Sequence, residues 1–167
     1  CMEKHGHNPL PWGILTGVRP VKLLRRLAEE SNEEQAVKKF ENDFFVSNEK
    51  IALSRETEHN ERKILELSKP ESFSLYVGIP FCPSRCSYCS FVMASIERAE
   101  KLIEPYTKLL CEEIKRTAEI ANKLGLRLET VYFGGGTPTT LSAEQLDTVL
   151  RTVNNSFDMS TCREFTV

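Results

Sequence analysis

The chain has 167 residues, of which 40% are hydrophobic and 28% are charged, and its formal net charge is −2 at pH 7. This composition is typical of a globular protein and excludes an intrinsically disordered chain. The small negative charge gives no electrostatic basis for binding nucleic acid or an anionic membrane. No apolar run approaches the ~18 residues of a membrane span, and the N-terminus lacks a signal-peptide pattern. We therefore expect a cytoplasmic protein.

Both ends of the sequence are unusual for a complete protein. The first residue is Cys1 and not an initiator methionine, and the last predicted strand runs to Val167 with no turn or cap after it. We therefore expect this sequence to be a segment of a longer protein.

Residues 1–72 are predicted to form a helical region. Pro20 suits a first helical position, and apolar residues follow it at helical spacing. Ser31 and Glu34 form a capping-box pattern that predicts the start of a second helix. Ser47 is the predicted cap of a third helix.

From residue 73 onward, strand patterns alternate with helical patterns. Short apolar runs predict three strands, at residues 73–79, 128–133 and 162–167. One helix is predicted from about Pro105 to Gly125, and a second is predicted to follow a capping box formed by Ser142 and Gln145. This alternation is typical of a parallel sheet with right-handed crossovers. We therefore expect an α/β protein with a helical region at 1–72 and an α/β region at 73–167.

Three of the six cysteines, Cys82, Cys86 and Cys89, lie within eight residues. In a cytoplasmic chain such clustering indicates metal or redox chemistry rather than structural disulfides. Cys111, inside a predicted helix, and Cys162, at the start of a predicted strand, are expected to act as small hydrophobic residues.

Three kinds of chemistry compete for this cysteine triplet. A structural zinc site needs four protein ligands, and no second Cys or His pair follows at a suitable distance. A thiol–disulfide couple of Cys86 and Cys89 would leave Cys82 without a role. An iron–sulfur cluster uses thiolate ligands, and three cysteines would leave one iron of a cubane cluster open to another ligand. The short loop, with spacings of three and two residues, favours the iron–sulfur cluster.

Three glycines, Gly134, Gly135 and Gly136, directly follow the second predicted strand, and Thr137 comes next. Taken alone they favour a simple turn, but backbone without Cβ atoms can also approach a ligand closely. The spacing is not that of a P-loop, so nucleotide phosphate is not indicated. Loops that follow consecutive parallel strands leave the sheet at the same edge. If the first two strands pair, the cysteine and glycine loops should face each other and form one site.

At this point the sequence resembles a known family. Residues 76–89 and 133–139 resemble the radical S-adenosylmethionine (SAM) superfamily. Within it, Ile-Pro-Phe-Cys and Gly-Gly-Gly-Thr-Pro-Thr are similar to the oxygen-independent coproporphyrinogen III dehydrogenase (oxidase)-like family, and residues 12–20 resemble the N-terminal extension of its Gram-positive branch. The resemblance implies that residues 73–167 form the first part of a partial (βα) barrel, with about three strands and two helices, and that the barrel continues beyond Val167.

The resemblance also implies cofactors and site residues. A 4Fe–4S cluster would be bound by Cys82, Cys86 and Cys89, with SAM on its fourth iron. The family's SAM contacts correspond to the following residues: Tyr76, Tyr88, Gly135, Gly136 and Thr137. Tyr76 also has a simpler interpretation, as a half-buried strand aromatic.

The implied reaction is the oxidative decarboxylation of coproporphyrinogen III to protoporphyrinogen IX in porphyrin (haem) biosynthesis. An electron donor would reduce the cluster, and reductive cleavage of SAM would give a 5′-deoxyadenosyl radical that abstracts hydrogen from the substrate. The implied partners are thus a porphyrinogen-class small molecule and the electron donor.

Two positions depart from the family pattern. Phe91 stands where the dehydrogenases have another cysteine, and Gly78 stands where they have histidine. A related branch consists of haem-binding chaperones. The alternative function is therefore a haem-binding or other metal-binding module without dehydrogenase activity.

Overall fold

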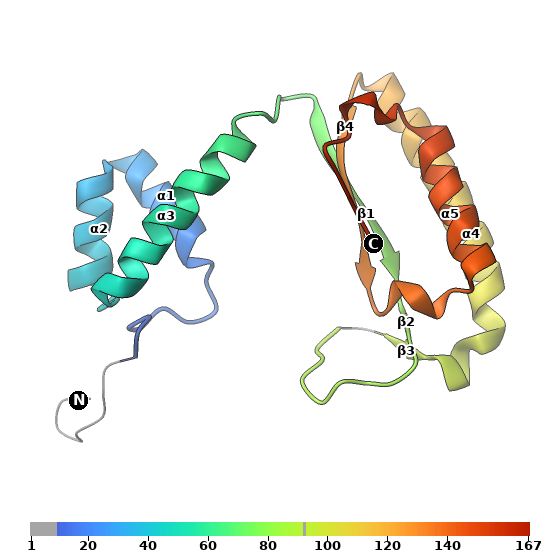
Figure 1. Cartoon of the computed structure of the whole chain (residues 1–167), viewed down its shortest axis with the longest axis horizontal. Coiled ribbons are helices and arrows are strands. Elements are labelled where there is room, and N and C mark those ends of the chain that lie inside the picture. The colour runs from blue at the N-terminus through green and yellow to red at the C-terminus, as the bar shows by residue number, and fades with distance from the viewer. Residues whose placement is uncertain (1–9, 92) are drawn as a thin grey trace. The chain divides into compact units, whose positions relative to one another are not determined.

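A computed structural model of the chain describes residues 10–91 and 93–167 (Figure 1). Cys1 lies outside the described residues. The contacts divide the chain into two compact units, one that ends at Ser68 and one that comprises Lys69–Val167. The predicted α/β class is confirmed: helices come first, and parallel strands alternating with helices follow.

The first unit is a group of three helices: α1 (Pro20–Glu30), α2 (Glu33–Asn42) and α3 (Asn48–Leu65). Each helix turns an apolar stripe inward, as amphipathic helices around a shared core do. The buried residues of this helical core are Leu24, Leu27, Ala36, Phe40, Val46 and Ile51.

In this unit, the helix starts confirm one of the two predicted caps and correct the other. Ser47 caps α3 as predicted, since its hydroxyl accepts a hydrogen bond from the Lys50 amide. The cap of α2 is Asn32, whose side chain accepts from the amide of Gln35 at 2.9 Å. Ser31 instead closes α1 by donating from its hydroxyl to the Leu27 carbonyl. Two adjacent residues could both cap a helix here, and asparagine serves as well as serine.

The second unit is built on a three-stranded sheet of order β1-β4-β5, all parallel. Its strands are β1 (Ser72–Ile79), β4 (Arg127–Gly135) and β5 (Glu164–Thr166). A small parallel pair follows β1, formed by β2 (Phe81–Cys82) and β3 (Ala94–Ser95). Two short 3₁₀ turns, η2 (Pro138–Thr140) and η3 (Met159–Thr161), precede α5 and β5 respectively.

The helices of this unit are α4 (Ile96–Lys123) and α5 (Ala143–Ser156). The Ser142–Gln145 capping box predicted for α5 is confirmed. The predicted start of α4 near Pro105 is wrong, because the helix begins at Ile96 and Pro105 lies inside it. Ala99 and Ile103 continue the buried stripe ahead of the proline. Their burial stabilises a helical segment that the proline by itself would disfavour.

Both helices pack on one face of the sheet (Figure 1). Alternate strand residues, such as Val77, Val131 and Phe133, point into this core and are almost fully buried. The predicted small-hydrophobe role of Cys111 is also confirmed, since it lies in α4 within the same core. The opposite face of the sheet carries exposed residues, including Tyr76 and Tyr132. In the described part of the chain, no helix combines the length and apolar character needed to cross a bilayer.

Candidate functional site

The candidate site begins where β1 and β4 end. These strands are parallel neighbours, and their last paired residues are Ile79 on β1 and Gly135 on β4 (Figure 1). Because parallel strands end at the same edge of a sheet, the loops that follow them start side by side. The predicted neighbour relation between the two loops is confirmed.

The glycine loop is hydrogen-bonded directly to the start of the cysteine loop. The amide of Gly136 donates to the carbonyl of Ile79 at 2.6 Å, and the amide of Thr137 donates to the carbonyl of Phe81 at 2.8 Å. These bonds continue the strand pairing past the end of the sheet, so the two loops form one continuous structure around Cys82.

Gly136 is a glycine because this contact leaves no room for a side chain. A Cβ atom there would lie 2.4 Å from the Phe81 carbonyl oxygen and 2.9 Å from the Cys82 sulfur. Gly135 has a different reason, since its φ of 101° lies in a region that other residues rarely adopt. The absence of side chains at these two positions brings bare backbone against the first cysteine.

The three clustered cysteines have very different exposure. Cys82 is buried, Cys89 is half-buried and Cys86 is exposed, and all three are free thiols. The amide of Cys89 donates to the Cys86 carbonyl, which turns the loop between them. Across residues 10–91 and 93–167, no three cysteine, histidine or acidic side chains are gathered in an arrangement that could hold a metal. The loop thus supplies three thiols on a short turn, and Cys82 lies against the glycine loop.

A side-chain contact also joins the two loops. The hydroxyl of Thr137 donates a hydrogen bond to the sulfur of Cys82, with 3.5 Å between the two atoms. The residues are 55 positions apart in the sequence. Of the predicted site residues, the structure therefore gathers Cys82, Gly135, Gly136 and Thr137.

The two predicted tyrosines lie in different surroundings. Tyr88 is 87% exposed and lies beside Cys86, where a hydrogen bond with the Cys86 side chain raises the pKa of its hydroxyl. Tyr76 lies on the open face of the sheet and stacks on Tyr132, with ring centroids 5.8 Å apart. Tyr76 is therefore next to the glycine strand, and Tyr88 is out on the cysteine loop.

Sequence reasoning missed Tyr132, and it included Gly134 in the glycine loop but not among the SAM contacts. A Cβ atom at Gly134 would lie 2.6 Å from the Tyr76 hydroxyl oxygen and 2.7 Å from the Tyr132 ring. Gly134 thus leaves the space that both rings occupy. The strand register that pairs Tyr76 with Tyr132 would have revealed this cluster, but the sequence does not give that register.

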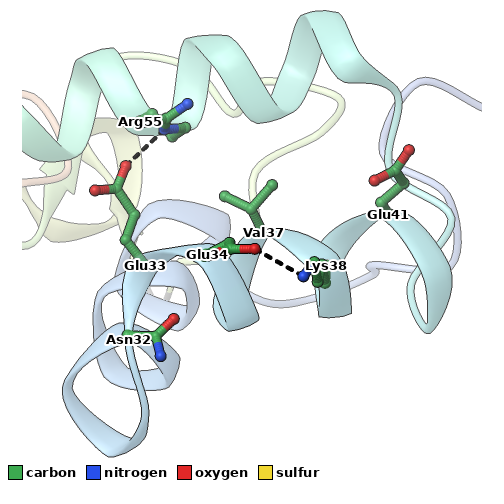
Figure 2. Close-up of a pocket in the computed structure, with 7 residues that line it drawn as sticks. All are labelled: Asn32, Glu33, Glu34, Val37, Lys38, Glu41 and Arg55. Carbon is green, nitrogen blue, oxygen red and sulfur yellow. Dashed lines mark hydrogen bonds and ion pairs between the residues drawn. The ribbon is translucent and has the colours of Figure 1, made fainter.

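A hollow elsewhere in the molecule is a poor candidate for a site. It measures about 610 Å³ and lies in the helical unit, between α2 and α3 (Figure 2). Its charged residues are exposed, and four of the five form ion pairs, Arg55 with Glu33 and Lys38 with Glu34. Exposed ion pairs of this kind are common on helix surfaces and contribute little. We therefore assign no function to it.

The comparisons with known proteins identify the class of this chain. A model of the radical SAM superfamily matches residues 76–162, which is more than half of the chain and includes both loops. The chain belongs to the radical SAM superfamily.

Several curated proteins are similar to this chain. The oxygen-independent coproporphyrinogen-III oxidase-like protein HemZ of Bacillus subtilis is 36% identical over 170 residues, covering 99% of this chain and 34% of HemZ. The heme chaperone HemW of Lactococcus lactis is 40% identical over 101 residues, covering 60% of this chain and 24% of HemW. The anaerobilin synthase of Escherichia coli O157:H7 is 31% identical over 104 residues, covering 62% of this chain and 23% of that protein.

The chain thus spans about a third or less of the length of these relatives. No solved structure matches it.

Proposed function

We propose that the α/β unit binds a 4Fe–4S cluster through Cys82, Cys86 and Cys89, and SAM beside it. The proposed SAM contacts are Tyr76, Tyr88, Gly135, Gly136 and Thr137. The observation that carries this proposal is the hydrogen-bonded junction between the two loops, in which Thr137 contacts the sulfur of Cys82.

The residues at this junction suit the proposed cofactors. Thiolates are the usual ligands of iron–sulfur clusters, and three of them leave one iron for an exogenous ligand. All three cysteines are free, and the exposed position of Cys86 allows its loop to close around a cluster. The glycine loop places backbone without Cβ atoms beside Cys82, and such backbone can be approached closely by a polar ligand such as the methionyl part of SAM.

Together, the bound cluster and SAM would supply a 5′-deoxyadenosyl radical for hydrogen abstraction. In that chemistry, the residues of this chain would bind and orient the cluster and SAM. Cys82 holds its ligand position away from water because it is buried. The exposed rings of Tyr76 and Tyr132 form an aromatic wall next to the glycine loop, on the face of the sheet that α4 and α5 leave open.

For the whole protein we propose an oxidoreductase that decarboxylates coproporphyrinogen III, in the cytoplasm and with an external electron donor. The name of the Bacillus subtilis relative, which matches nearly the full chain, supports this substrate class. The same proposal makes residues 73–167 the first part of a partial barrel and leaves residues 1–72 as a helical extension.

A second candidate is a haem-binding chaperone. It is favoured by the similarity to the heme chaperone HemW of Lactococcus lactis, which covers 60% of this chain. It is also consistent with Phe91, which stands where the dehydrogenase pattern has a further cysteine. The two candidates share the cluster and differ in what the whole protein does with a tetrapyrrole.

Cluster binding is tested by anaerobic reconstitution of the chain with iron and sulfide. We expect about four irons per chain. Cys82→Ala should abolish cluster assembly, whereas Cys111→Ala is the matched control, because Cys111 is equally buried but lies in the helix-facing core. Equal loss of iron in both variants, or stoichiometric zinc in place of iron, would contradict the proposed ligands.

The reaction is tested on the whole protein. A decarboxylase should produce 5′-deoxyadenosine when reductant, SAM and coproporphyrinogen III are supplied, and the porphyrinogen should lose carboxyl groups. Haem binding without any SAM cleavage would favour the chaperone and reject the oxidoreductase.

A further inference from the structure

The side chain of Thr137 is held in place by the hydrogen bonds of its own backbone. Its amide donates to the carbonyl of Phe81 at 2.8 Å, and its carbonyl accepts from the backbone amide of Thr140 at 2.9 Å. Because the amide and the carbonyl of Thr137 are both hydrogen-bonded, the backbone position from which its side chain extends is fixed. Its hydroxyl is directed at the sulfur of Cys82 and donates to it.

The Thr137 hydroxyl can form a hydrogen bond to the sulfur and a second hydrogen bond to SAM at the same time. A threonine hydroxyl has one proton and two acceptor lone pairs. The proton is donated to the Cys82 sulfur, so the lone pairs remain available to accept a hydrogen bond from SAM. A contact with the sulfur is therefore compatible with the SAM contact proposed above.

A hydrogen bond to a ligand sulfur has a known electronic consequence. Hydrogen bonds to the sulfurs are among the features that set the reduction potential of an iron–sulfur cluster. Reduction adds negative charge to the cluster and its ligands, and a donor to a more negative sulfur forms a stronger bond. The donor therefore favours the reduced form and raises the potential. Groups behind a metal ligand also hold it in position.

We propose that Thr137 is a positioning residue for the cluster: its hydroxyl holds the sulfur of Cys82 and makes the bound cluster easier to reduce. This inference rests on the proposed function, since it takes Cys82 as a cluster ligand. It adds a role for Thr137 that is separate from SAM binding and is present when SAM is absent.

The test compares the reduction potential of the cluster in variants of the anaerobically reconstituted chain, without SAM. Thr137→Val removes the donor and keeps the β-branched shape, which suits the extended backbone at this position (φ −124°, ψ 103°). Thr137→Ala removes the same donor in a smaller side chain, and Thr137→Ser keeps the donor. Thr140→Val is the matched control, because it removes a hydroxyl from the same turn that bonds to carbonyls and not to sulfur.

We expect both Thr137→Val and Thr137→Ala to shift the potential to more negative values, while Thr137→Ser and Thr140→Val stay near the wild-type potential. The positioning role would also be supported if Thr137→Val and Thr137→Ala lost iron while Thr137→Ser and Thr140→Val retained it. Circular dichroism of the iron-free variants checks that the unit is folded.

Two results would overturn the inference while leaving the proposed function intact. One is a wild-type potential in the donor-free variants, and the other is an equal shift in all four variants, which would indicate a general effect of altering the turn. Absence of a four-iron cluster in the wild-type chain would reject the proposed function, and the inference with it.

Discussion

The helical unit and the α/β unit each enclose an apolar core and carry exposed ion pairs on their helices, but the hollow of the helical unit and the loop junction of the α/β unit are built from different groups. In the helical unit, charged side chains pair along exposed helix faces, as Arg55 does with Glu33. In the α/β unit, uncharged small residues and one buried sulfur meet where two strands end. The comparison shows that density of charge is a poor guide to the candidate site. Glycine backbone placed beside a thiol is a better guide to the candidate site.

Each unit has its own optical reporter. The single tryptophan, Trp12, packs against the core of the helical unit. All four tyrosines of the chain lie in the α/β unit. Tryptophan fluorescence and the near-ultraviolet circular dichroism of tyrosine can therefore follow the unfolding of the two units separately.

The largest effect is expected for Phe40→Ala. Phe40 is fully buried in the helical unit, and removal of a buried phenylalanine side chain typically costs about 3–5 kcal/mol. Denaturant unfolding should show a large loss of stability in the tryptophan signal. The tyrosine signal should not change, because the two buried clusters share no residue. An equal shift in both signals would show that the units unfold as one.

Gly136→Ala should have the next largest effect and should act at the site. The new Cβ would collide with the Phe81 carbonyl and the Cys82 sulfur, so we expect a loss of about 1–3 kcal/mol in the tyrosine signal and a loss of bound iron.

Gly125→Ala is the control for this change. Gly125 also lies in the α/β unit, at a φ of 65° and with no atom near its missing Cβ. Its replacement should cost about 1 kcal/mol through backbone strain alone and leave iron binding unchanged. Retention of iron by Gly136→Ala would contradict the proposed tight junction.

A smaller effect is expected from the pH dependence of the helical unit. Partial burial tends to raise the carboxyl pKa of Glu58, but hydrogen bonds from Arg62 and Arg25 outweigh it, and the pKa lies below its ordinary value of 4.5. A carboxylate whose pKa is lowered by folding stabilises the folded state above its unfolded pKa. That contribution is lost as the pH falls through the lower, folded pKa.

Glu58→Gln should therefore weaken the acid sensitivity of the tryptophan signal, measured by denaturant unfolding at several pH values below about 4.5. We expect a loss of about 1 kcal/mol or less at neutral pH, because Arg62 is half-exposed. Glu34→Gln, at an exposed ion pair with Lys38, is the control. An unchanged acid response in Glu58→Gln would contradict this assignment.

The smallest effect is expected at the charged hollow of the helical unit (Figure 2). Arg55→Gln removes the ion pair with Glu33, in which both side chains are more than half exposed. We expect a change of less than about 0.5 kcal/mol and no change in iron binding. A loss of iron in this variant would contradict the comparison of the two units, because it would show that the charged surface of the helical unit contributes to iron binding.

Most local features of the fold were predictable from short stretches of sequence. The caps at Ser47 and Ser142 depend on hydrogen bonds within three residues, and both predictions are confirmed. The errors arose where local signals were ambiguous or overridden. Asn32 took the capping position from its neighbour Ser31, and core packing extended α4 through Pro105.

The candidate site was predictable in its parts but not in its contacts. The spacing of the cysteines and the run of glycines indicated chemistry without any structure. The stack of Tyr76 on Tyr132 beside Gly134 was not visible, because it depends on the register between two strands more than 50 residues apart. The proposed ligand and SAM-binding roles stay predictions until iron and SAM binding are measured.

By itself, the sequence determined the residue types available for chemistry, the alternation of strands and helices, and the edge at which the two loops had to leave a parallel sheet. The tertiary structure decided which of these residues touch. It placed the Thr137 hydroxyl on the Cys82 sulfur, and it buried Glu129, an ordinary surface charge by sequence, between Ser72 and Arg163. The physical reason is the range of the interactions. Periodicity and capping act over a few residues, whereas strand register is set by packing between segments that are distant in the chain.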